Sequence, residues 1–333
     1  MLLGHEGRGC EQKNGQEPGA LRVGFHPWAE CSIEGAMAFA RRDEFVWQLR
    51  TRSLELGKRT LLMGVLNVTP DSFSDGNLFL DLEAATARAL RMLDDGADIV
   101  DIGGESTRPG RYVPVTAEEE QRRVLPVIEA VLKGRPGSVL SIDTYKASTA
   151  ALAVEAGAEI VNDISALSWD TEMASTCARF GCGLVMMHTR GKSAEWRNLP
   201  RLAPHEALPL VKHELALSMR TALEARIDRS RIVLDPGYGF GKSFDENYPL
   251  LAHQDELESL GQPILAGVSR KSFLARKLAE FHGGADAPMA ARSNATIAAT
   301  VAAILAGAHI VRVHEVRPAI EAARIADAIL TAV

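Results

Sequence analysis

The chain has 333 residues, of which 46% are hydrophobic and 24% charged, so it can bury one large α/β core and is not disordered as a whole. Its net charge of −6 argues against nucleic-acid binding, because contact with phosphates usually leaves a basic footprint. The four cysteines, at positions 10, 31, 177 and 182, have neither metal-ligand nor disulfide spacing, and no segment is long and apolar enough to cross a bilayer.

The first 36 residues differ from the rest of the chain. They mix Gly, Glu, Gln, Asn and Pro without periodicity, which predicts a disordered leader, with Met37 as an alternative start of the protein. This leader contains no hydrophobic signal-peptide core, so we expect a cytoplasmic protein. We expect residues 37–59 to form a short N-terminal segment, with helical and strand-like parts, that precedes the main domain. Its charged stretch through Leu56 has a helix-like composition.

From Thr60 onward, short β-branched runs alternate with helix-length segments rich in Ala, Leu, Glu and Arg. The predicted strands are 60–68, 98–104, 138–144, 159–165, 183–188, 231–237, 263–269 and 309–315. The predicted helices are 81–95, 116–133, 146–156, 204–228, 288–306 and 316–331. This alternation predicts an α/β fold, a (β/α)8 TIM barrel over residues 60–333. A doubly wound open sheet is the alternative, but no G-x-G-x-x-G motif follows the first strand.

Nearly every predicted strand ends in a polar or ionisable residue. These residues are Asn67, Asp101, Asp143, Asn162, His188, Asp235, Ser269 with Lys271, and Arg312 with His314. One such residue alone is more often a helix cap or a structural group than a functional one. So many together would be costly to bury without a ligand, and the strand ends of a parallel barrel converge, so they predict a polar pocket at one mouth.

The pocket residues divide by their chemistry into two predicted sets. The acceptors Asp101, Asp143, Asn162 and Asp235 suit a flat, nitrogen-rich heterocycle that presents several N–H donors. A separate set, Lys271, Arg312 and His314 together with Asn67, suits a phosphate or diphosphate group. A heterocycle at one end and a diphosphate at the other imply a small-molecule substrate with a leaving group.

Five segments resemble, in order, the signature segments of the dihydropteroate synthase family. They are 67–76 (Asn-Val-Thr-Pro-Asp-Ser-Phe-Ser-Asp-Gly), 101–110 (Asp-Ile-Gly-Gly-Glu-Ser-Thr-Arg-Pro-Gly), 235–242 (Asp-Pro-Gly-Tyr-Gly-Phe-Gly-Lys), 269–271 (Ser-Arg-Lys) and 312–314 (Arg-Val-His). The resemblance runs from about Thr60 to the C-terminus. It implies a (β/α)8 barrel and a transferase of folate synthesis. The implied reaction joins 6-hydroxymethyl-7,8-dihydropterin diphosphate to 4-aminobenzoate and releases diphosphate.

The resemblance also implies a role for each matching residue. Asp143, Asn162, Asp235 and Lys271 would hold the pterin, with Asp101 close by. Asn67, Arg312 and His314 would hold the diphosphate, with Asn67 also reaching a Mg²⁺ ion. The 4-aminobenzoate site would be shaped by Phe73, Thr107, Arg108, Pro109, Phe240 and Ser272. The expected catalytic residues are Asp71, Asp75, Arg108, Asp235 and Lys271, and the Ala-rich segment 295–306 would form a homodimer interface.

The chemistry favours a dissociative substitution. A methylene on an electron-rich dihydropterin can lose diphosphate and leave a resonance-stabilised cation. We expect Mg²⁺, Arg312 and His314 to stabilise the leaving group and Asp235 to stabilise the cation. Asp71 and Asp75 would steady that cation or orient the first loop against Arg108.

The chain departs from the family pattern at four places. Asn77 stands for a second glycine, Thr189-Arg190 for a more usual Met-Gln, Glu315 for an aspartate and, as a mild change, Tyr238 for a phenylalanine. A pterin-binding methyltransferase barrel is the nearest alternative enzyme, but it has little use for segment 105–110 or for Arg312 with His314. A catalytically silent paralogue that binds pterin and a partner is the other alternative.

Overall fold

The computed structural model describes residue 39 and the ranges 41–68, 78–106 and 114–332, except for the side chains of residues 78–80 and 197. Contacts divide the chain into two units, Met1–Met37 and Ala38–Val333. The first unit lies wholly outside the described residues, so the predicted leader remains a prediction. Everything below concerns the second unit.

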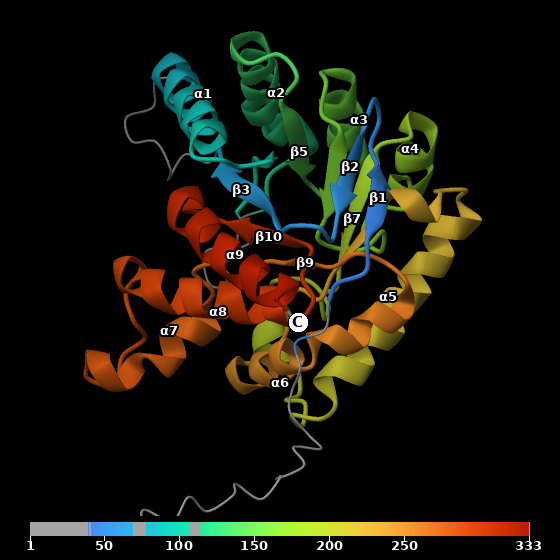
Figure 1. Ribbon diagram of the computed structural model, residues 1–333. Coiled ribbons are helices and arrows are strands. Elements are labelled where there is room, and N and C mark those ends of the chain that lie inside the picture. Colours follow the sequence, from blue (N-terminus) through green and yellow to red (C-terminus); the bar gives the residue numbers. More distant parts are fainter. Residues whose placement is uncertain (1–38, 40, 69–77, 107–113, 333) are drawn as a thin grey trace, which may run out of the picture. The chain divides into compact units, whose positions relative to one another are not determined.

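A parallel sheet of eight strands forms the centre of this unit and is drawn in Figure 1. The strands are β3 (Leu61–Asn67), β4 (Ile99–Gly103), β5 (Val139–Asp143), β6 (Ile160–Asp163), β7 (Gly183–Met187), β8 (Ile232–Asp235), β9 (Leu265–Ala266) and β10 (Ile310–Val313). Their order is β8-β7-β6-β5-β4-β3-β10-β9. A bridge between Leu234 and Ile264 joins the two ends, with the Leu234 N–H donating to the Pro263 carbonyl at 2.9 Å. The predicted barrel is therefore confirmed.

Helices alternate with these strands, as the sequence predicts. They are α1 (Leu78–Asp94), α2 (Ala117–Gly134), α3 (Ala147–Glu155), α4 (Met173–Phe180), α5 (Ala207–Glu224), α6 (Asn247–Ala252), α7 (Ser272–Lys277), α8 (Ser293–Leu305) and α9 (Val316–Thr331). All eight predicted strands are present, and so are the six predicted helices. The sequence analysis missed α4, α6 and α7, because helices of 8, 6 and 6 residues are too short to establish a helical period.

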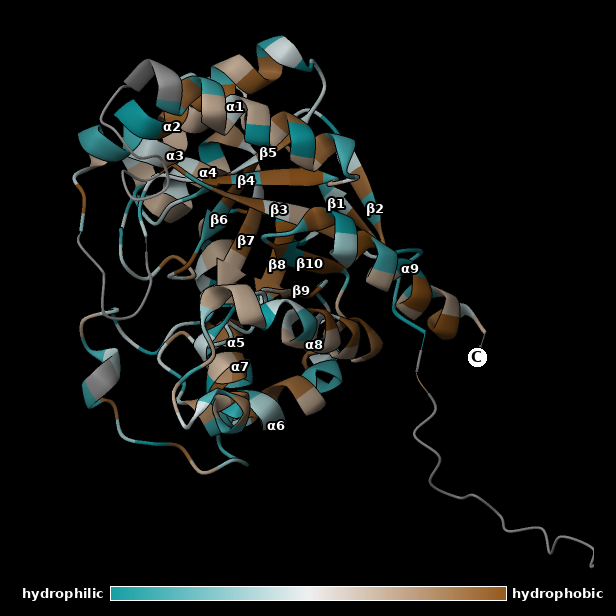
Figure 2. Ribbon diagram, turned by 90° about the vertical axis from the view of Figure 1, so that its left-hand side faces the viewer, coloured by the Kyte–Doolittle hydropathy of each residue, from teal (hydrophilic) through white to brown (hydrophobic). Residues whose placement is uncertain are grey.

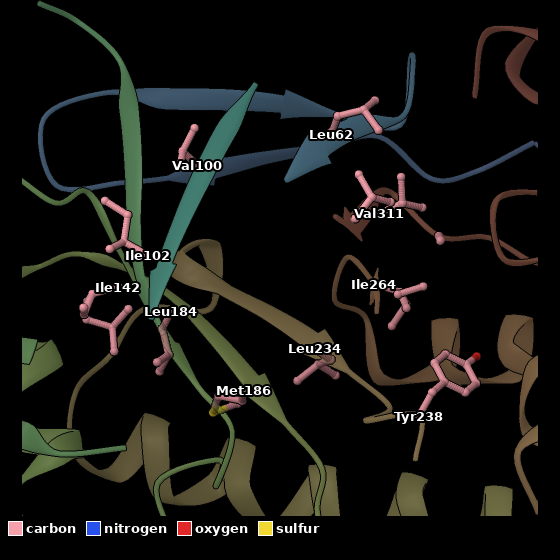
Figure 3. Packing of buried hydrophobic residues seen from close by; sticks show 14 of the residues in the cluster. Leu62, Val100, Ile102, Ile142, Leu184, Met186, Leu234, Tyr238, Ile264 and Val311 are labelled. Carbon is pink, nitrogen blue, oxygen red and sulfur yellow. The ribbon is translucent and has the colours of Figure 1, made fainter. Parts of the chain in front are cut away.

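The two faces of each strand have different partners. One set of strand residues, including Leu62, Val100 and Leu184, belongs to an apolar cluster that also contains buried helix residues. Figure 3 shows these three side chains on their strands. The alternate residues form a second apolar cluster inside the barrel, from Met63, Ile99, Val139, Ile160, Val185, Val233, Leu265 and Ile310. Because successive side chains point to opposite faces of a strand, the residues two and four positions further along also face the barrel interior. Figure 2 shows the apolar strands inside helices that carry both polar and apolar residues.

A β-hairpin covers the start of the barrel strands. It consists of β1 (Phe45–Gln48) and β2 (Ser53–Leu56), paired antiparallel. Trp47 and Leu56 are each 1% exposed and belong to the same apolar cluster as the first inward residue of each barrel strand. The Trp47 indole N–H donates to the Arg231 carbonyl at 2.8 Å. The hairpin therefore closes this end of the barrel and leaves the opposite end for a site.

The helix-like prediction for the stretch through Leu56 is wrong. Its charged residues suggested a helix, but burial alternates with a period of two: Trp47 and Leu49 are buried, whereas Val46 before them is 53% exposed and Gln48 between them is partly exposed. That alternation is typical of a strand with one buried face.

Over the described part of the chain, no helix combines the length and the apolar character that spanning a membrane requires.

Trp47→Ala should lower the free energy of unfolding by about 3–5 kcal/mol, because it removes a buried aromatic ring from the hairpin plug. Urea denaturation followed by circular dichroism measures this change. Val46→Ala, on the exposed face of the same strand, is the matched control and should change stability by no more than about 0.5 kcal/mol. Equal effects of the two substitutions would show that the hairpin does not close the barrel core.

Candidate active site

The alternation that builds the apolar layer also brings polar residues to the opposite mouth. Asp101 lies two residues after Ile99 on β4, and Asp143 lies four residues after Val139 on β5. In the sheet register, Val65 pairs with Asp101, and Asp143 pairs with both Gly103 and Asn162. Met187 pairs with Asp235 at the ends of β7 and β8. The predicted strand-end residues therefore converge.

A buried network joins four strands at this mouth. Arg312 on β10 donates from Nε to Asp101 Oδ2 at 2.6 Å and from Nη2 to Asp143 Oδ2 at 2.5 Å. Asn162 on β6 donates to the same Asp101 oxygen at 2.9 Å. Asp101 is 0% exposed, and its Oδ1 atom has no hydrogen-bond partner within the described residues. One acceptor of the network is therefore available to a ligand.

This network corrects the prediction of two separate residue sets. Arg312, which we expected among the diphosphate-binding cations, lies against the acceptors expected to hold a heterocycle. Burial lowers the pKa of its guanidinium, but the attraction of Asp101 and Asp143 more than offsets this and raises the pKa overall. Burial raises the pKa of Asp143 to about 7, although Arg312 opposes the shift. Acidic and cationic groups therefore share one cluster.

Asp235 and the following turn form the adjacent wall. The Gly237 N–H donates to Asp235 Oδ1 at 2.7 Å, and burial raises the pKa of the carboxyl group. Gly237 has φ +67°, and a Cβ atom there would lie 1.9 Å from the His188 carbonyl oxygen. Only glycine fits this turn, because any side chain would clash with the neighbouring backbone.

Lys271 approaches Asp235 from the β9–α7 connection. Its Nζ lies 4.0 Å from the centre of the Phe240 ring, a cation–π contact. Burial lowers the pKa of Lys271 to about 7, although attraction to Asp235 opposes the shift. Phe240, Lys271 and Asp235 thus form one continuous wall of the mouth.

A strained residue fixes the position of Lys271. Arg270 has φ +58°, which is uncommon for a side chain of this size. Its N–H donates to Thr296 Oγ1 at 3.0 Å, its carbonyl accepts from Arg292 at 3.0 Å, and its Nη2 lies 3.1 Å from Glu315 Oε1. These contacts hold the loop in a conformation that directs the next residue into the mouth.

Lys242 organises the glycine-rich turn from inside. Its Nζ donates to the carbonyl of Gly237 at 2.8 Å and lies 3.3 Å and 3.4 Å from those of Phe240 and His188. Burial lowers the pKa of this lysine to about 7, although Asp235 opposes the shift. One ammonium group therefore ties together the segment that carries Phe240.

His188 is buried beside this turn rather than open to the mouth. Its Nε2 lies 2.9 Å from Glu214 Oε2, and its Nδ1 has no hydrogen-bond partner in the described part of the chain. Burial lowers the pKa of His188 to about 4, with Lys242 adding to the shift. The ring is therefore neutral at pH 7 and acts as a structural group.

The adjacent residues Asn162 and Asp163 have different tasks. Asn162 joins the Arg312 network, whereas Asp163 accepts from the N–H groups of Ser165 at 2.8 Å and Leu167 at 2.7 Å. These bonds hold Leu167 at φ +70°. Asp163 therefore shapes the turn and does not face the mouth.

The remaining described site residues lie at the rim. His314 Nδ1 lies 3.0 Å from Ser269 Oγ, which ties the β10–α9 connection to the β9–α7 connection. Asn67 is the last residue of β3 and is half-buried, and Ser272 is the first residue of α7. Asn67 ends β3, and His314 and Ser272 follow β10 and β9, so all three belong to the end of the barrel away from the hairpin.

Six predicted site residues lie outside the described residues: Asp71, Phe73, Asp75, Thr107, Arg108 and Pro109. Their segments follow Val68 and Ser106, just after β3 and β4, so the mouth is the place from which both segments start. The Asn77 departure also lies in the first of them. The roles of these residues stay predictions.

The sequence analysis missed two polar residues of this region, Ser141 and Lys242. Ser141 is 0% exposed and pairs with Asp101, and its Oγ has no hydrogen-bond partner among the residues described. Its position two residues before Asp143 was the available signal, since both face the barrel interior. Lys242 is the last residue of the segment 235–242, but only the folded turn shows that this lysine is buried.

The assembled mouth offers buried acceptors on Asp101, Asp143, Asn162 and Asp235, and cationic groups on Lys271 and Arg312. Such a pocket can hold a planar ring with several N–H donors and can stabilise negative charge at the ring's far end.

Comparison with known proteins supports this chemistry. Residues 63–314 match the family model described as pterin binding enzyme. The dihydropteroate synthase of Bacillus subtilis is 42% identical over 278 residues, which cover 84% of this chain and 91% of the relative. That of Clostridium beijerinckii is 39% identical, covering 85% of this chain and 99% of the relative.

Solved structures agree with the sequence relatives. Xanthomonas albilineans dihydropteroate synthase with 4-aminobenzoic acid has a TM-score of 0.77 and 39% identity, covering 87% of this chain and 100% of that chain. The same enzyme in complex with 7,8-dihydropteroate has a TM-score of 0.71 and 38% identity, covering 84% and 97%. The resemblance read from the five segments is therefore confirmed: this chain belongs to the dihydropteroate synthase family of pterin-binding enzymes.

Proposed function

We propose that this chain is a transferase that condenses 6-hydroxymethyl-7,8-dihydropterin diphosphate with 4-aminobenzoate, giving 7,8-dihydropteroate and diphosphate. The buried acceptor cluster at the mouth, with Asp101, Asp143 and Asn162 joined through Arg312, carries the proposal. It is supported by relatives solved with 4-aminobenzoic acid and with 7,8-dihydropteroate. The family membership disfavours the methyltransferase alternative.

We place the pterin ring against the acidic cluster of Asp101, Asp143 and Asp235. The 2-amino group and adjacent ring nitrogen of a pterin present neighbouring N–H donors, which suit the oxygens of Asp101, Asp143 and Asp235 and the amide of Asn162. Lys271 would donate to the ring's acceptors from the opposite wall. When the ring's donors engage the acids, the Arg312 guanidinium becomes available to the diphosphate.

The proposed chemistry is a dissociative substitution at the methylene carbon. The C–O bond to diphosphate breaks, the electron pair leaves with diphosphate, and the pterin-conjugated methylene becomes cationic. Asp235 stabilises that cation, and Arg312 and His314 stabilise the departing oxyanion. The neutral amine of 4-aminobenzoate then forms the C–N bond and loses one proton to solvent.

Magnesium fits this rim as a partner of the diphosphate. Mg²⁺ is often held by one or two protein oxygens, with substrate phosphates and waters completing its shell. Asn67 offers a half-buried amide that has no hydrogen bond to any residue in the described ranges. No group of three His, Cys, Asp or Glu residues in those ranges could hold a metal, so Asn67 and the diphosphate would hold it. When bound, Mg²⁺ would neutralise charge on the leaving group.

The 4-aminobenzoate site keeps its predicted residues. Phe240 and Ser272 border the mouth in the described structure, whereas Phe73, Thr107, Arg108 and Pro109 lie outside it. We assign Asp71 and Asp75 the predicted task of steadying the cation or orienting the first loop against Arg108.

We also propose that the protein is a cytoplasmic homodimer. Helix α8 exposes Ala298 and Ala302, small residues that permit close approach of a second helix. On α9, Ile325 is 66% exposed and Ile329 is 38% exposed. A second copy of the chain would cover this surface.

A coupled assay tests the function: diphosphate should be released only when the pterin diphosphate and 4-aminobenzoate are both present. The gene should also rescue a strain that lacks its own synthase. If folded protein fails in both tests while it still binds pterin, the silent-paralogue alternative is correct.

Asp235→Asn should lower kcat/KM for the pterin diphosphate by roughly 10- to 150-fold, because it removes a charged hydrogen-bond acceptor beside the developing cation. Steady-state kinetics and pterin titration measure the effect. Asp255→Asn, at an exposed carboxylate, is the control. Unchanged turnover with wild-type pterin affinity would remove Asp235 from the mechanism.

The activity should have a bell-shaped pH profile near neutrality. Asp143 must be ionised to accept from the ring, and its pKa of about 7 sets the acid limb. Lys271 carries its proton only below its pKa of about 7, so its contribution is lost as the pH rises through that value. Lys271→Arg, which stays protonated, should move only the basic limb, to higher pH. A basic limb that does not move in kcat/KM would contradict this assignment.

Lys242→Met should raise KM for the pterin diphosphate more than it lowers kcat, because three carbonyls lose the cation that holds the Phe240 turn. Lys277→Met, at an exposed lysine, is the control. Thermal melting separates this local effect from unfolding. A change in kcat alone would assign Lys242 to the chemical step instead.

A further inference from the structure

A buried lysine lies just past the end of β5, three residues after Asp143. Lys146 Nζ contacts Glu105 Oε2, which follows β4, and lies 3.3 Å from Glu120 Oε2 on α2. The side chains of Lys146, Glu105 and Glu120 are 13%, 4% and 1% exposed. One ammonium group therefore joins carboxylates from two other elements in a place that water barely reaches.

Lys146 is a poor choice for its local position. It is the N-cap residue of α3 and makes no side-chain capping hydrogen bond. N-cap positions favour Ser, Thr, Asp and Asn, and the positive end of a helix dipole disfavours a cation. The first N–H group of α3, from Ala147, donates instead to Asp170 Oδ2 at 2.8 Å. Because local preference argues against a lysine here, the reason for it lies in its tertiary contacts.

These contacts lead to Asp143 through the residue next to it. Thr144 is 2% exposed, and its hydroxyl donates to Glu120 Oε2 at 2.9 Å and accepts from the Lys146 N–H at 3.1 Å. Asp143 accepts from Arg312 on the side of the mouth, whereas Thr144 bonds Glu120 on the side of α2. The cluster of Glu105, Glu120 and Lys146 therefore holds the end of β5 from behind its acid.

The end of β4 is held by the same cluster. The Tyr145 hydroxyl lies 3.3 Å and 3.4 Å from the two carboxylate oxygens of Glu105. A Cβ atom on Gly104 would lie 2.9 Å from Val124 Cγ1, so this strand end packs closely against α2. Because β4 also carries Asp101, the cluster fixes the two acids that share Arg312 relative to each other.

The cluster also acts on Asp143 through its charge. Burial raises the pKa of Asp143 to about 7, and the negative charges of Asp101 and Glu120 add to that shift. Burial also raises the pKa of Glu120, although attraction to Lys146 opposes it. Without Lys146, two buried carboxylates would lie behind Asp143 with no cation between them, which is strongly unfavourable.

We propose that Lys146 is a positioning residue of the pterin site, which holds the ends of β4 and β5 so that Asp143 meets the ring in a fixed place. Lys146 acts through Asp143 and not by contact with the ring. The inference rests on the proposed function only in taking the barrel mouth as the place where a pterin binds.

Titration calorimetry of the whole chain with 6-hydroxymethylpterin, which lacks the leaving group and cannot react, tests the proposal. Lys146→Met should raise the dissociation constant about tenfold or more, because a displaced acceptor no longer meets the ring. Lys146→Arg keeps the charge and should restore most of the affinity. Trp47→Ala is the matched control: it destabilises the opposite end of the barrel and should bind the pterin as wild type does. Equal weakening by Trp47→Ala and Lys146→Met would reduce Lys146 to a general stabilising role and overturn the proposal.

A double-mutant cycle with Asp143→Asn tests whether Lys146 acts through Asp143. In the Asp143→Asn background, Lys146→Met should change the dissociation constant by no more than about twofold. Effects that simply multiply would show that the two residues act independently, which contradicts the proposal.

If Lys146→Met does not fold, Thr144→Val decides the question. It removes the hydroxyl that links Glu120 and Lys146 to the end of β5, keeps the side-chain shape, and should raise the dissociation constant about threefold. Unchanged affinity in this variant would refute the positioning role. None of these titrations measures turnover. A folded protein that binds pterin but makes no dihydropteroate would contradict the proposed function and leave this result unaffected.

Discussion

The structure of the barrel mouth depends on one buried cation between two carboxylates. Asp101 and Asp143 lie on neighbouring strands, where unpaired negative charges would be too costly to bury. Arg312, from the strand on the other side of β3, donates to both, and Asn162 satisfies the remaining lone pair of the same Asp101 oxygen. This arrangement lets the fold keep several acceptors dry and fixed without a ligand. It also means that a ring with its own N–H donors must compete with, or reposition, the arginine.

The rest of the mouth is built to hold groups in place rather than to leave them free. Lys242 gathers three backbone carbonyls, Gly237 makes room for the backbone of the neighbouring strand, and Arg270 accepts a strained conformation that directs Lys271. At the opposite end, the β1–β2 hairpin fills the barrel with apolar side chains. The polar end alone is therefore available for chemistry, and burial there shifts the pKa values of Asp143, Lys242 and Lys271 towards 7.

Much of this could be read from the sequence, and the failures have identifiable causes. Every barrel strand was predicted, because an apolar run followed by a polar residue is a local pattern. The short helices α4, α6 and α7 were missed because they are too brief to show a period. The N-terminal segment through Leu56 was misread because its charges suggested a helix, whereas the alternating burial of Trp47 and Leu49 exists only against the folded barrel.

The sequence by itself determined which polar residues stand at which strand ends, and so the fold and the family, because parallel strands bring their ends to one mouth. Only the tertiary structure decided which acidic side chain pairs with which basic one. Arg312 is 211 residues from Asp101 and 169 from Asp143, and no local pattern joins groups so far apart. Closure of the barrel does so, and the accompanying loss of water shifts the pKa values of Asp143, Lys242 and Lys271 towards 7.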